Sequence, residues 1–155
     1  MPSAYVGIGS NVGDPVSNVR RAFDALSDVG TVTARSSLYR TKPWGKTDQA
    51  DFVNAVARVE TRLVPRELLQ MLKSLETQLG RTEGERWGPR VIDLDLLTYD
   101  DRSIDEPGLR VPHVQIAQRA FVLVPLAEID AAYEPLRNAL PPDELSGVHR
   151  LPPSP

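Results

Sequence analysis

The order of hydrophobic patterns along the chain constrains its fold more than any other sequence feature. Residues 4–8 have the composition of a strand, and Asp14-Pro15 is a favourable helix start, because Asp caps free N–H groups and Pro is tolerated at the first helical position. The apolar residues that follow at helical spacing are Val16, Val19, Phe23 and Leu26. Gly30 closes this element and strand-like alternation resumes over residues 31–39, which predicts a β-α-β unit.

The next segment repeats this order. After a polar loop over residues 41–51, residues 52–60 alternate as a strand and should pair with the preceding one. Pro65 opens a helix that ends at Gly80, and residues 91–99 form a further strand. The order β-α-β-β-α-β is typical of the ferredoxin-like α+β fold, an antiparallel sheet with helices on one face, so we expect the site on the free face.

The remaining segment adds smaller elements. A short extended piece is expected at 109–111, and a helix over 117–124 that Pro125 should end or kink. The tail 151–155, LPPSP, is expected to be disordered. We therefore expect a single domain over residues 1–155, with C-terminal additions to the core.

The strand at 91–99 carries two acids at alternate positions. Asp93 and Asp95 should share one face, roughly 7 Å apart along the strand, while Ile92, Leu94 and Leu96 point into the core. Like charges this close repel unless a cation lies between them, and Mg²⁺ is the usual ion where phosphate is bound. Two Mg²⁺ ions about 3.5 to 4 Å apart could clamp a polyphosphate here. The alternative is a solvated acidic face of an antiparallel sheet.

The segment before these acids is rich in arginine and glycine. Arg81, Arg86 and Arg90 could fork onto phosphate oxygens, and Trp87 lies among glycines that would let a loop close as a lid. The alternative is that the arginines pair on the surface with neighbouring glutamates, which contributes about 0 to 1 kcal/mol per pair.

Composition excludes several classes of function. The chain has no cysteine, which rules out disulfides, thiolate metal sites and cysteine nucleophiles. Its net charge of −3 argues against a general attraction to nucleic acid, and no apolar run is long enough to span a bilayer. We expect a cytoplasmic monomer that binds neither nucleic acid nor membrane.

Four sequence blocks together resemble one enzyme family. They are GSN at 9–11, FVNAV at 52–56, GRTEGERWGPRVIDLDLL at 80–97 and VPHVQIAQRAF at 111–121. In this order they resemble hydroxymethyl-dihydropterin pyrophosphokinase of folate synthesis. The resemblance implies transfer of pyrophosphate from ATP to the hydroxymethyl group of a reduced pterin, with release of AMP and the use of two Mg²⁺ ions.

The resemblance also implies roles for individual residues. It makes Asp93 and Asp95 metal ligands, and Arg81 and Arg90 their catalytic partners at the triphosphate. The implied pterin contacts are Thr41, Pro43, Trp44, Phe52, Asn54 and Phe121. The implied ATP contacts are Glu76, Arg81, Arg86, Trp87, Arg90, Leu96, His113 and Arg119. Without the resemblance, Phe52 and Phe121 are more simply read as core residues, and His113 as a structural histidine after Pro112.

One departure from the family concerns the phosphate loop, where Glu83 stands at a position that is arginine in many members. Two alternatives to a pyrophosphokinase also stay open. One is another Mg²⁺-dependent nucleotidyl or phosphoryl transferase on the same scaffold. The other is a ferredoxin-like module that binds nucleotide or RNA through sheet aromatics. The reaction products and the need for Mg²⁺ would discriminate between them.

Overall fold

The computed structural model describes residues 1–42, 49–80, 91–113 and 116–153. Six strands form an antiparallel sheet in the order β5-β1-β4-β3-β8, with β2 also paired to β4. The strands are β1 (Ser3–Ser10), β2 (Thr31–Arg35), β3 (Tyr39–Thr41), β4 (Phe52–Glu60), β5 (Asp93–Tyr99) and β8 (Val148–Arg150). A separate hairpin joins β6 (Ile104–Glu106) to β7 (Leu109–Val111).

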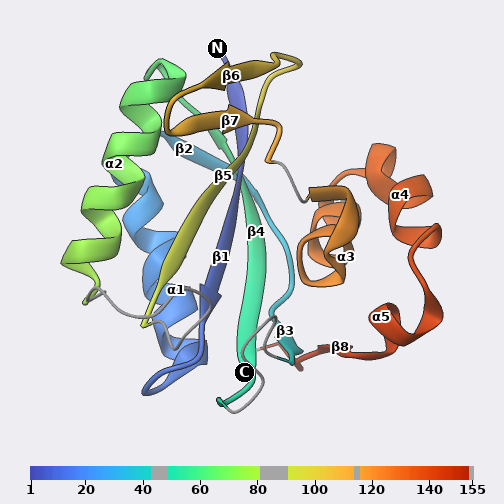
Figure 1. The fold of residues 1–155 in the computed structure, drawn as a ribbon. Helices are drawn as coiled ribbons and strands as arrows, with labels where there is room; N and C mark the ends of the chain where they lie inside the picture. The colour runs from blue at the N-terminus through green and yellow to red at the C-terminus, as the bar shows by residue number, and fades with distance from the viewer. Residues whose placement is uncertain (43–48, 81–90, 114–115, 154–155) are drawn as a thin grey trace.

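Helices lie on both faces of the sheet (Figure 1). On one face lie α1 (Pro15–Ala25) and α2 (Pro65–Gln78); on the other lie α3 (Ala120–Ile129), α4 (Glu134–Asn138) and α5 (Pro142–Ser146). Short 3₁₀ turns occur at η1 (Leu26–Asp28), η2 (Ile116–Gln118) and η3 (Ala131–Tyr133). No helix within the described ranges is long and apolar enough to cross a bilayer.

The helix starts follow the sequence signals. The Asp14 carboxylate accepts a hydrogen bond from the Ser17 N–H at 3.2 Å, and Pro15 occupies the first helical position. α2 likewise begins at Pro65. It is followed by Gly80 at φ +105°, a conformation that favours glycine after a helix end.

Two hydrophobic clusters hold the layers together. The larger lies between the sheet and the pair α1 and α2, and the smaller joins Val56 and Leu97 to Val122 and Leu126 of α3. A bulge lies in β5, where Leu97 has no partner between the pairs Val6–Leu96 and Tyr5–Thr98. The extra residue reverses the alternation of faces. Leu97 still lies on the face of the two acids and packs against α3, whereas Tyr99, beyond the bulge, lies on the opposite face and belongs to the larger cluster.

The structure corrects the expected strand at 31–39, which is divided into β2 and β3. Both parts pair with β4, but between them the Ser36 hydroxyl, rather than a carbonyl, accepts the Val56 N–H at 2.9 Å. A side-chain oxygen thus replaces one bond of the ladder, which interrupts the strand.

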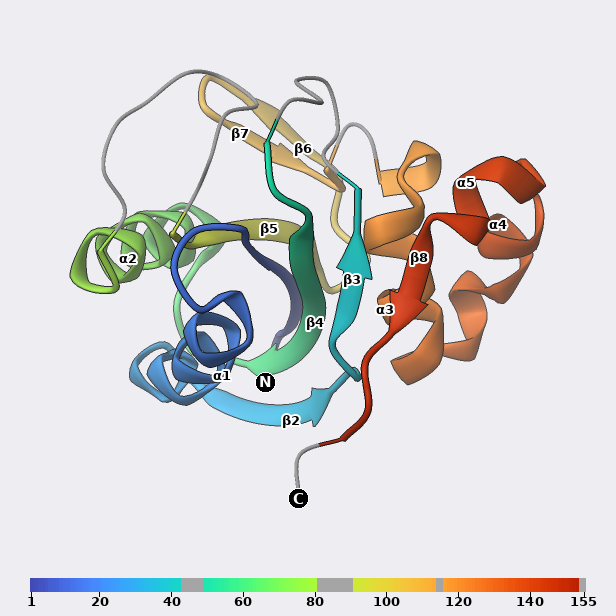
Figure 2. The same ribbon diagram turned by 90° about the horizontal axis from the view of Figure 1, so that it is seen from below.

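The C-terminal half differs from expectation in three further ways. Pro125 lies inside α3 and does not end it. The helix continues because Leu123 and Leu126 on either side of the proline are fully buried, and this packing outweighs the missing N–H. α3 also covers part of the sheet face expected to be free (Figure 2). Finally, Leu151, expected within a disordered tail, donates its N–H to the Leu38 carbonyl at 2.8 Å and packs against the larger cluster.

Candidate active site

The sheet places the candidate site residues in rows across its strands. Asp93 of β5 lies opposite Gly9 of β1, which in turn lies opposite Asn54 of β4. Residues paired across an antiparallel sheet point to the same face, so the acid and the amide flank the bare backbone of Gly9. Asp95 occupies the next such row, opposite Gly7. The two acids and the amide therefore face the part of the sheet that α3 leaves open.

Asp95 is held in a setting that opposes its ionisation. Burial, followed by repulsion from Asp93, raises the pKa of Asp95 from 3.8 to about 8. Glu76 adds to the rise, whereas the cations Lys73 and Arg119 oppose it. A divalent cation between the two acids would remove this cost. The pair therefore has the donor chemistry of a Mg²⁺ site, as the alternation of acids predicts.

The buried Glu76 side chain joins α2 to the acid-bearing strand. It is 2% exposed, and its Oε2 accepts the N–H of Leu94 at 2.7 Å, between the two aspartates. Its Oε1 lies 3.5 Å from the Lys73 ammonium group one helical turn away. Glu76 thus fixes the backbone that presents the acids.

A cleft of about 590 Å³ opens beside Asp95. Its walls are Leu69 and Lys73 of α2, Asp95 and Leu96 of β5, residues 105–110 of the hairpin, and His113. The cleft has the size of a small-molecule site, and its mixture of apolar and charged side chains suits a nucleotide. It brings together the expected metal ligand Asp95 and two of the expected ATP contacts, Leu96 and His113.

The position of His113 is fixed by its backbone, whose N–H donates to the Leu97 carbonyl at 2.8 Å. Burial and then the nearby Arg119 guanidinium lower the pKa of His113, which favours the neutral imidazole. Arg119 is 6% exposed, and its guanidinium carbon lies 5.6 Å from the centre of the Phe121 ring. Arg119 thus acts electrostatically on His113, an expected ATP contact, and contacts the ring of Phe121, an expected pterin contact.

Three of the residues expected to bind the pterin, Thr41, Phe52 and Asn54, lie together on β3 and β4 beside Gly9. Asn54 is 7% exposed, and its Nδ2 donates to the Thr41 hydroxyl at 2.6 Å. Phe52 lies opposite Thr41 across β3 and β4. A Cβ at Gly9 would lie 2.8 Å from Asn54 Oδ1 and 3.8 Å from Phe52 Cδ1, so only glycine leaves room for this arrangement.

Several expected site residues lie outside the described residues. They are Pro43 and Trp44 of the pterin loop and Arg81, Arg86, Trp87 and Arg90 of the arginine-rich segment. The departure at Glu83 lies there too. In the described ranges no group of three or more His, Asp or Glu side chains is arranged to hold a metal.

Two contributors to the cleft were not anticipated from the sequence. Lys73 stands three residues before Glu76 on a helix, a spacing that already places the two side chains together. The hairpin residues 105–110 carry no comparable signal, because only the folded chain brings them against α2 and β5.

Comparison with known proteins decides the family. Residues 5–131 match the sequence model of the 7,8-dihydro-6-hydroxymethylpterin-pyrophosphokinase (HPPK) family. The chain belongs to the HPPK family. It is 44% identical to a 2-amino-4-hydroxy-6-hydroxymethyldihydropteridine pyrophosphokinase of Methylorubrum extorquens, over 97% of this chain and 99% of the relative. The protein of the same name from Bacillus subtilis is 45% identical over 81% of this chain and 77% of the relative.

Solved structures of HPPK-DHPS proteins share the fold. The Plasmodium falciparum A437G protein superposes with a TM-score of 0.74 at 15% identity, over 88% of this chain and 45% of that one. A second HPPK-DHPS structure, in complex with substrates, gives 0.72 at 13% identity, over 89% of this chain and 43% of that one. This chain thus spans less than half of these longer HPPK proteins, and the likeness concerns the fold.

Proposed function

We propose that this protein transfers the pyrophosphoryl group of ATP to the hydroxymethyl group of 6-hydroxymethyl-7,8-dihydropterin, a step of folate biosynthesis. The observation that carries the proposal is the row Asp93–Gly9–Asn54, which sets a carboxylate and a buried amide on the same face of the sheet. Family membership and the shared name of the relatives supply the substrates.

In the proposed reaction the pterin alcohol oxygen forms a bond to the β-phosphorus of ATP. The bond from that phosphorus to the oxygen bridging to the α-phosphate breaks, AMP leaves with the electron pair, and the hydroxyl proton is released. Such a transfer needs alignment and neutralisation of charge more than a covalent intermediate. The residues of this chain therefore have positioning and electrostatic roles.

Asp93 and Asp95 would hold Mg²⁺, and we propose that two ions bind. When bound, this metal neutralises phosphate charge and holds the polyphosphate in a fixed geometry. Lys73 lies in the same cleft and brings a further positive charge to the nucleotide side. We further propose that Arg81 and Arg90 contact the triphosphate, with Arg86 and Trp87 closing over it.

On the pterin side, Asn54 offers polar atoms to the edge of the bicycle, and the rings of Phe52 and Phe121 offer stacking surfaces. Asn54 is buried, and a buried amide needs hydrogen-bond partners. Among the described residues its side chain makes one hydrogen bond, to Thr41. The amide oxygen and one N–H are therefore left for a ligand. Thr41 and the segment with Pro43 and Trp44 would complete the pocket.

We also propose that strands β5, β1, β4 and β2 form a ferredoxin-like core, to which β3 and β8 are added. Antiparallel pairing of β1 with both β4 and β5, and of β2 with β4, supports this description.

The decisive experiment identifies the products. The protein is incubated with ATP, Mg²⁺ and the reduced pterin alcohol, and the products are identified by mass. AMP and the pterin diphosphate are expected; ADP or free pyrophosphate as the product would favour another transferase. Asp93→Asn should reduce turnover by about 10³-fold or more, whereas the exposed Asp28→Asn should not change it.

A further inference from the structure

The C-terminal segment lies outside the family match yet joins the central sheet. The match ends at residue 131, and the chain beyond it forms α4, α5 and β8. β8 pairs antiparallel with β3, with Tyr39 opposite Arg150 and Thr41 opposite Val148. β3 is 3 residues long and has β4 on its other side. The C-terminal strand therefore supplies one of the two neighbours of a very short strand.

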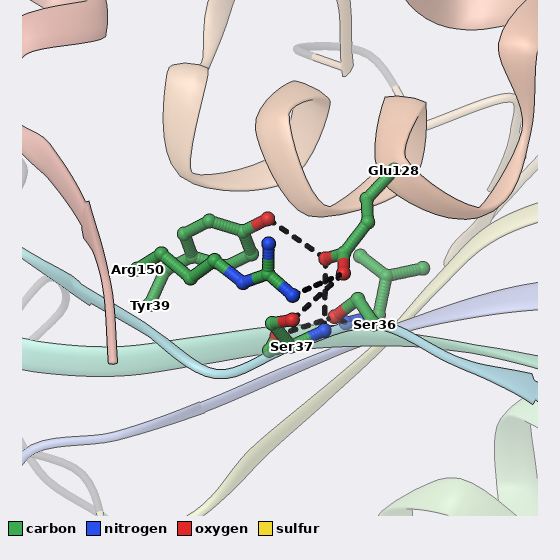
Figure 3. A network of polar contacts seen from close by, with 6 residues as sticks. Ser36, Ser37, Tyr39, Glu128 and Arg150 are labelled. Carbon is green, nitrogen blue, oxygen red and sulfur yellow. Dashed lines mark hydrogen bonds and ion pairs between the residues drawn. The ribbon is translucent and has the colours of Figure 1, made fainter. Parts of the chain in front are cut away.

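A carboxylate of α3 fixes the chain that leads into β3. Glu128 accepts hydrogen bonds from the Ser37 N–H at 2.8 Å, the Ser37 hydroxyl at 2.7 Å and the Tyr39 hydroxyl at 2.7 Å. Arg150 of β8 lies 3.8 Å from the same carboxylate. Figure 3 shows these groups meeting between β3 and α3. Because an ionised acceptor makes stronger hydrogen bonds, Glu128 ties three segments distant in sequence to one point.

The strand held in this way carries the partner of Asn54. The Thr41 hydroxyl accepts the Asn54 Nδ2–H at 2.6 Å, while on the opposite side Gly9 leaves space for Asn54 Oδ1. A change in the position of β3 would therefore move the hydroxyl that orients this amide. Displacements of about 1 Å are enough to weaken recognition by a preorganised site.

We propose that Glu128 is a positioning residue of the pterin pocket, and that it acts with β8 by holding β3 so that Thr41 orients the Asn54 amide. This inference rests on the proposed function, because it assumes that Asn54 contacts the pterin. It assigns to α3 and the C-terminal strand a role in substrate recognition in addition to packing.

The test separates pterin recognition from general stability. In Glu128→Gln, KM for the pterin should rise about fivefold or more, while KM for ATP stays within about twofold, because the cleft that takes the nucleotide lies on the other side of β1. Tyr39→Phe removes one hydrogen bond of the three and should give a smaller rise. Glu144→Gln, an exposed change on α5, should alter neither constant.

Thr41 provides a second test within the pocket itself. Thr41→Val removes the hydroxyl that accepts the Asn54 hydrogen bond while keeping the side-chain shape, and it should raise the pterin KM. Thr41→Ser keeps the hydroxyl, so its pterin KM should stay close to that of the wild type. An unchanged pterin KM in Glu128→Gln would overturn the inference, as would an equal rise in both KM values. If Glu128→Gln does not fold, an unchanged pterin KM in Tyr39→Phe together with Thr41→Val overturns it. A wild-type enzyme that makes no pterin diphosphate would instead defeat the proposed function.

Discussion

At the scale of single residues, the ionised carboxylate of Asp95 that the proposed metal site needs lowers the stability of the ligand-free fold. Burial and repulsion by Asp93 make the ionised carboxylate unfavourable in the ligand-free fold, as its pKa of about 8 indicates. Because the folded pKa lies above the ordinary value of 3.8, the folded state retains a proton that the unfolded chain loses. The stability associated with this proton is complete below pH 3.8 and is lost as the pH rises to about 8.

Asp95→Asn should therefore abolish turnover and stabilise the ligand-free protein in alkaline solution. The amide cannot ionise, so at pH 9 the variant should melt a few degrees above the wild type, which corresponds to about 1 kcal/mol or more. Near pH 4 the two proteins should melt together. Thermal unfolding followed by circular dichroism at both pH values measures the difference. A variant less stable than the wild type at pH 9 would contradict the account of Asp95.

Gly9 gives a second prediction at this scale. Gly9→Ala would place a Cβ 2.8 Å from Asn54 Oδ1, so the amide must move and the pterin KM should rise by about tenfold. Steady-state kinetics with each substrate varied in turn measures the effect. Gly147→Ala is the control, since the nearest atom to its Cβ would be 3.7 Å away. A normal pterin KM in Gly9→Ala would show that the orientation of Asn54 is not important.

At the scale of elements, the cleft proposed for the nucleotide depends on a short hairpin held at its turn. Arg66, at the start of α2, contacts the Glu106 carboxylate at 3.4 Å and the Pro107 carbonyl at 3.2 Å. Asp105 and Arg110 form a further ion pair at 3.1 Å across the strands. These contacts fix the outer wall of the cleft against the helix that forms another wall.

Arg66→Ala should loosen this wall. Its side chain is 46% exposed and exposed ion pairs contribute about 0 to 1 kcal/mol, so KM for ATP should rise by no more than about fivefold and the pterin KM should stay unchanged. Equilibrium titration with a nonhydrolysable ATP analogue measures the change directly. Arg62→Ala, an exposed change before α2, is the matched control. A larger effect on the pterin than on the nucleotide would refute this role of the hairpin.

At the scale of the whole molecule, two layers of different extent cover the sheet. α1 and α2 cover one face with the larger cluster, whereas α3 covers the other face only where Val56 and Leu97 lie. The part of that face that α3 does not cover contains Asp93, Asp95 and Asn54. Because α3 covers only part of its face of the sheet, the rest of that face is left for the candidate site.

Ligands that bind this open face should stabilise the entire fold. ATP with Mg²⁺ at about 100 times its Kd should add about 2.7 kcal/mol to the free energy of unfolding, or roughly 5 to 10 °C in Tm. Without a divalent cation the shift should nearly vanish, since Asp93 and Asp95 would then repel the phosphates. Differential scanning fluorimetry with ATP, with and without EDTA, makes the comparison. An equal shift in both conditions would show that these acids do not hold a metal.

Local pattern was sufficient to predict most of the elements. Strand β4 has the expected bounds, and α1 and α2 begin at the prolines that mark them, because alternation and capping depend on neighbours in sequence. The shared face of Asp93 and Asp95 and the block around them were likewise readable from the chain alone. Local pattern failed at Ser36, which interrupts a strand through a contact with Val56, and at Pro125, where burial on both sides maintains a helix.

What the sequence by itself determined was the order of strands and helices, the acid pair and the family. Only the tertiary structure decided which groups stand beside them. Lys73 near Asp95, Thr41 on Asn54 and the C-terminal β8 beside β3 depend on strand register and layer packing. These contacts join residues distant in sequence, and their geometry depends on how the whole core closes, which no local periodicity records.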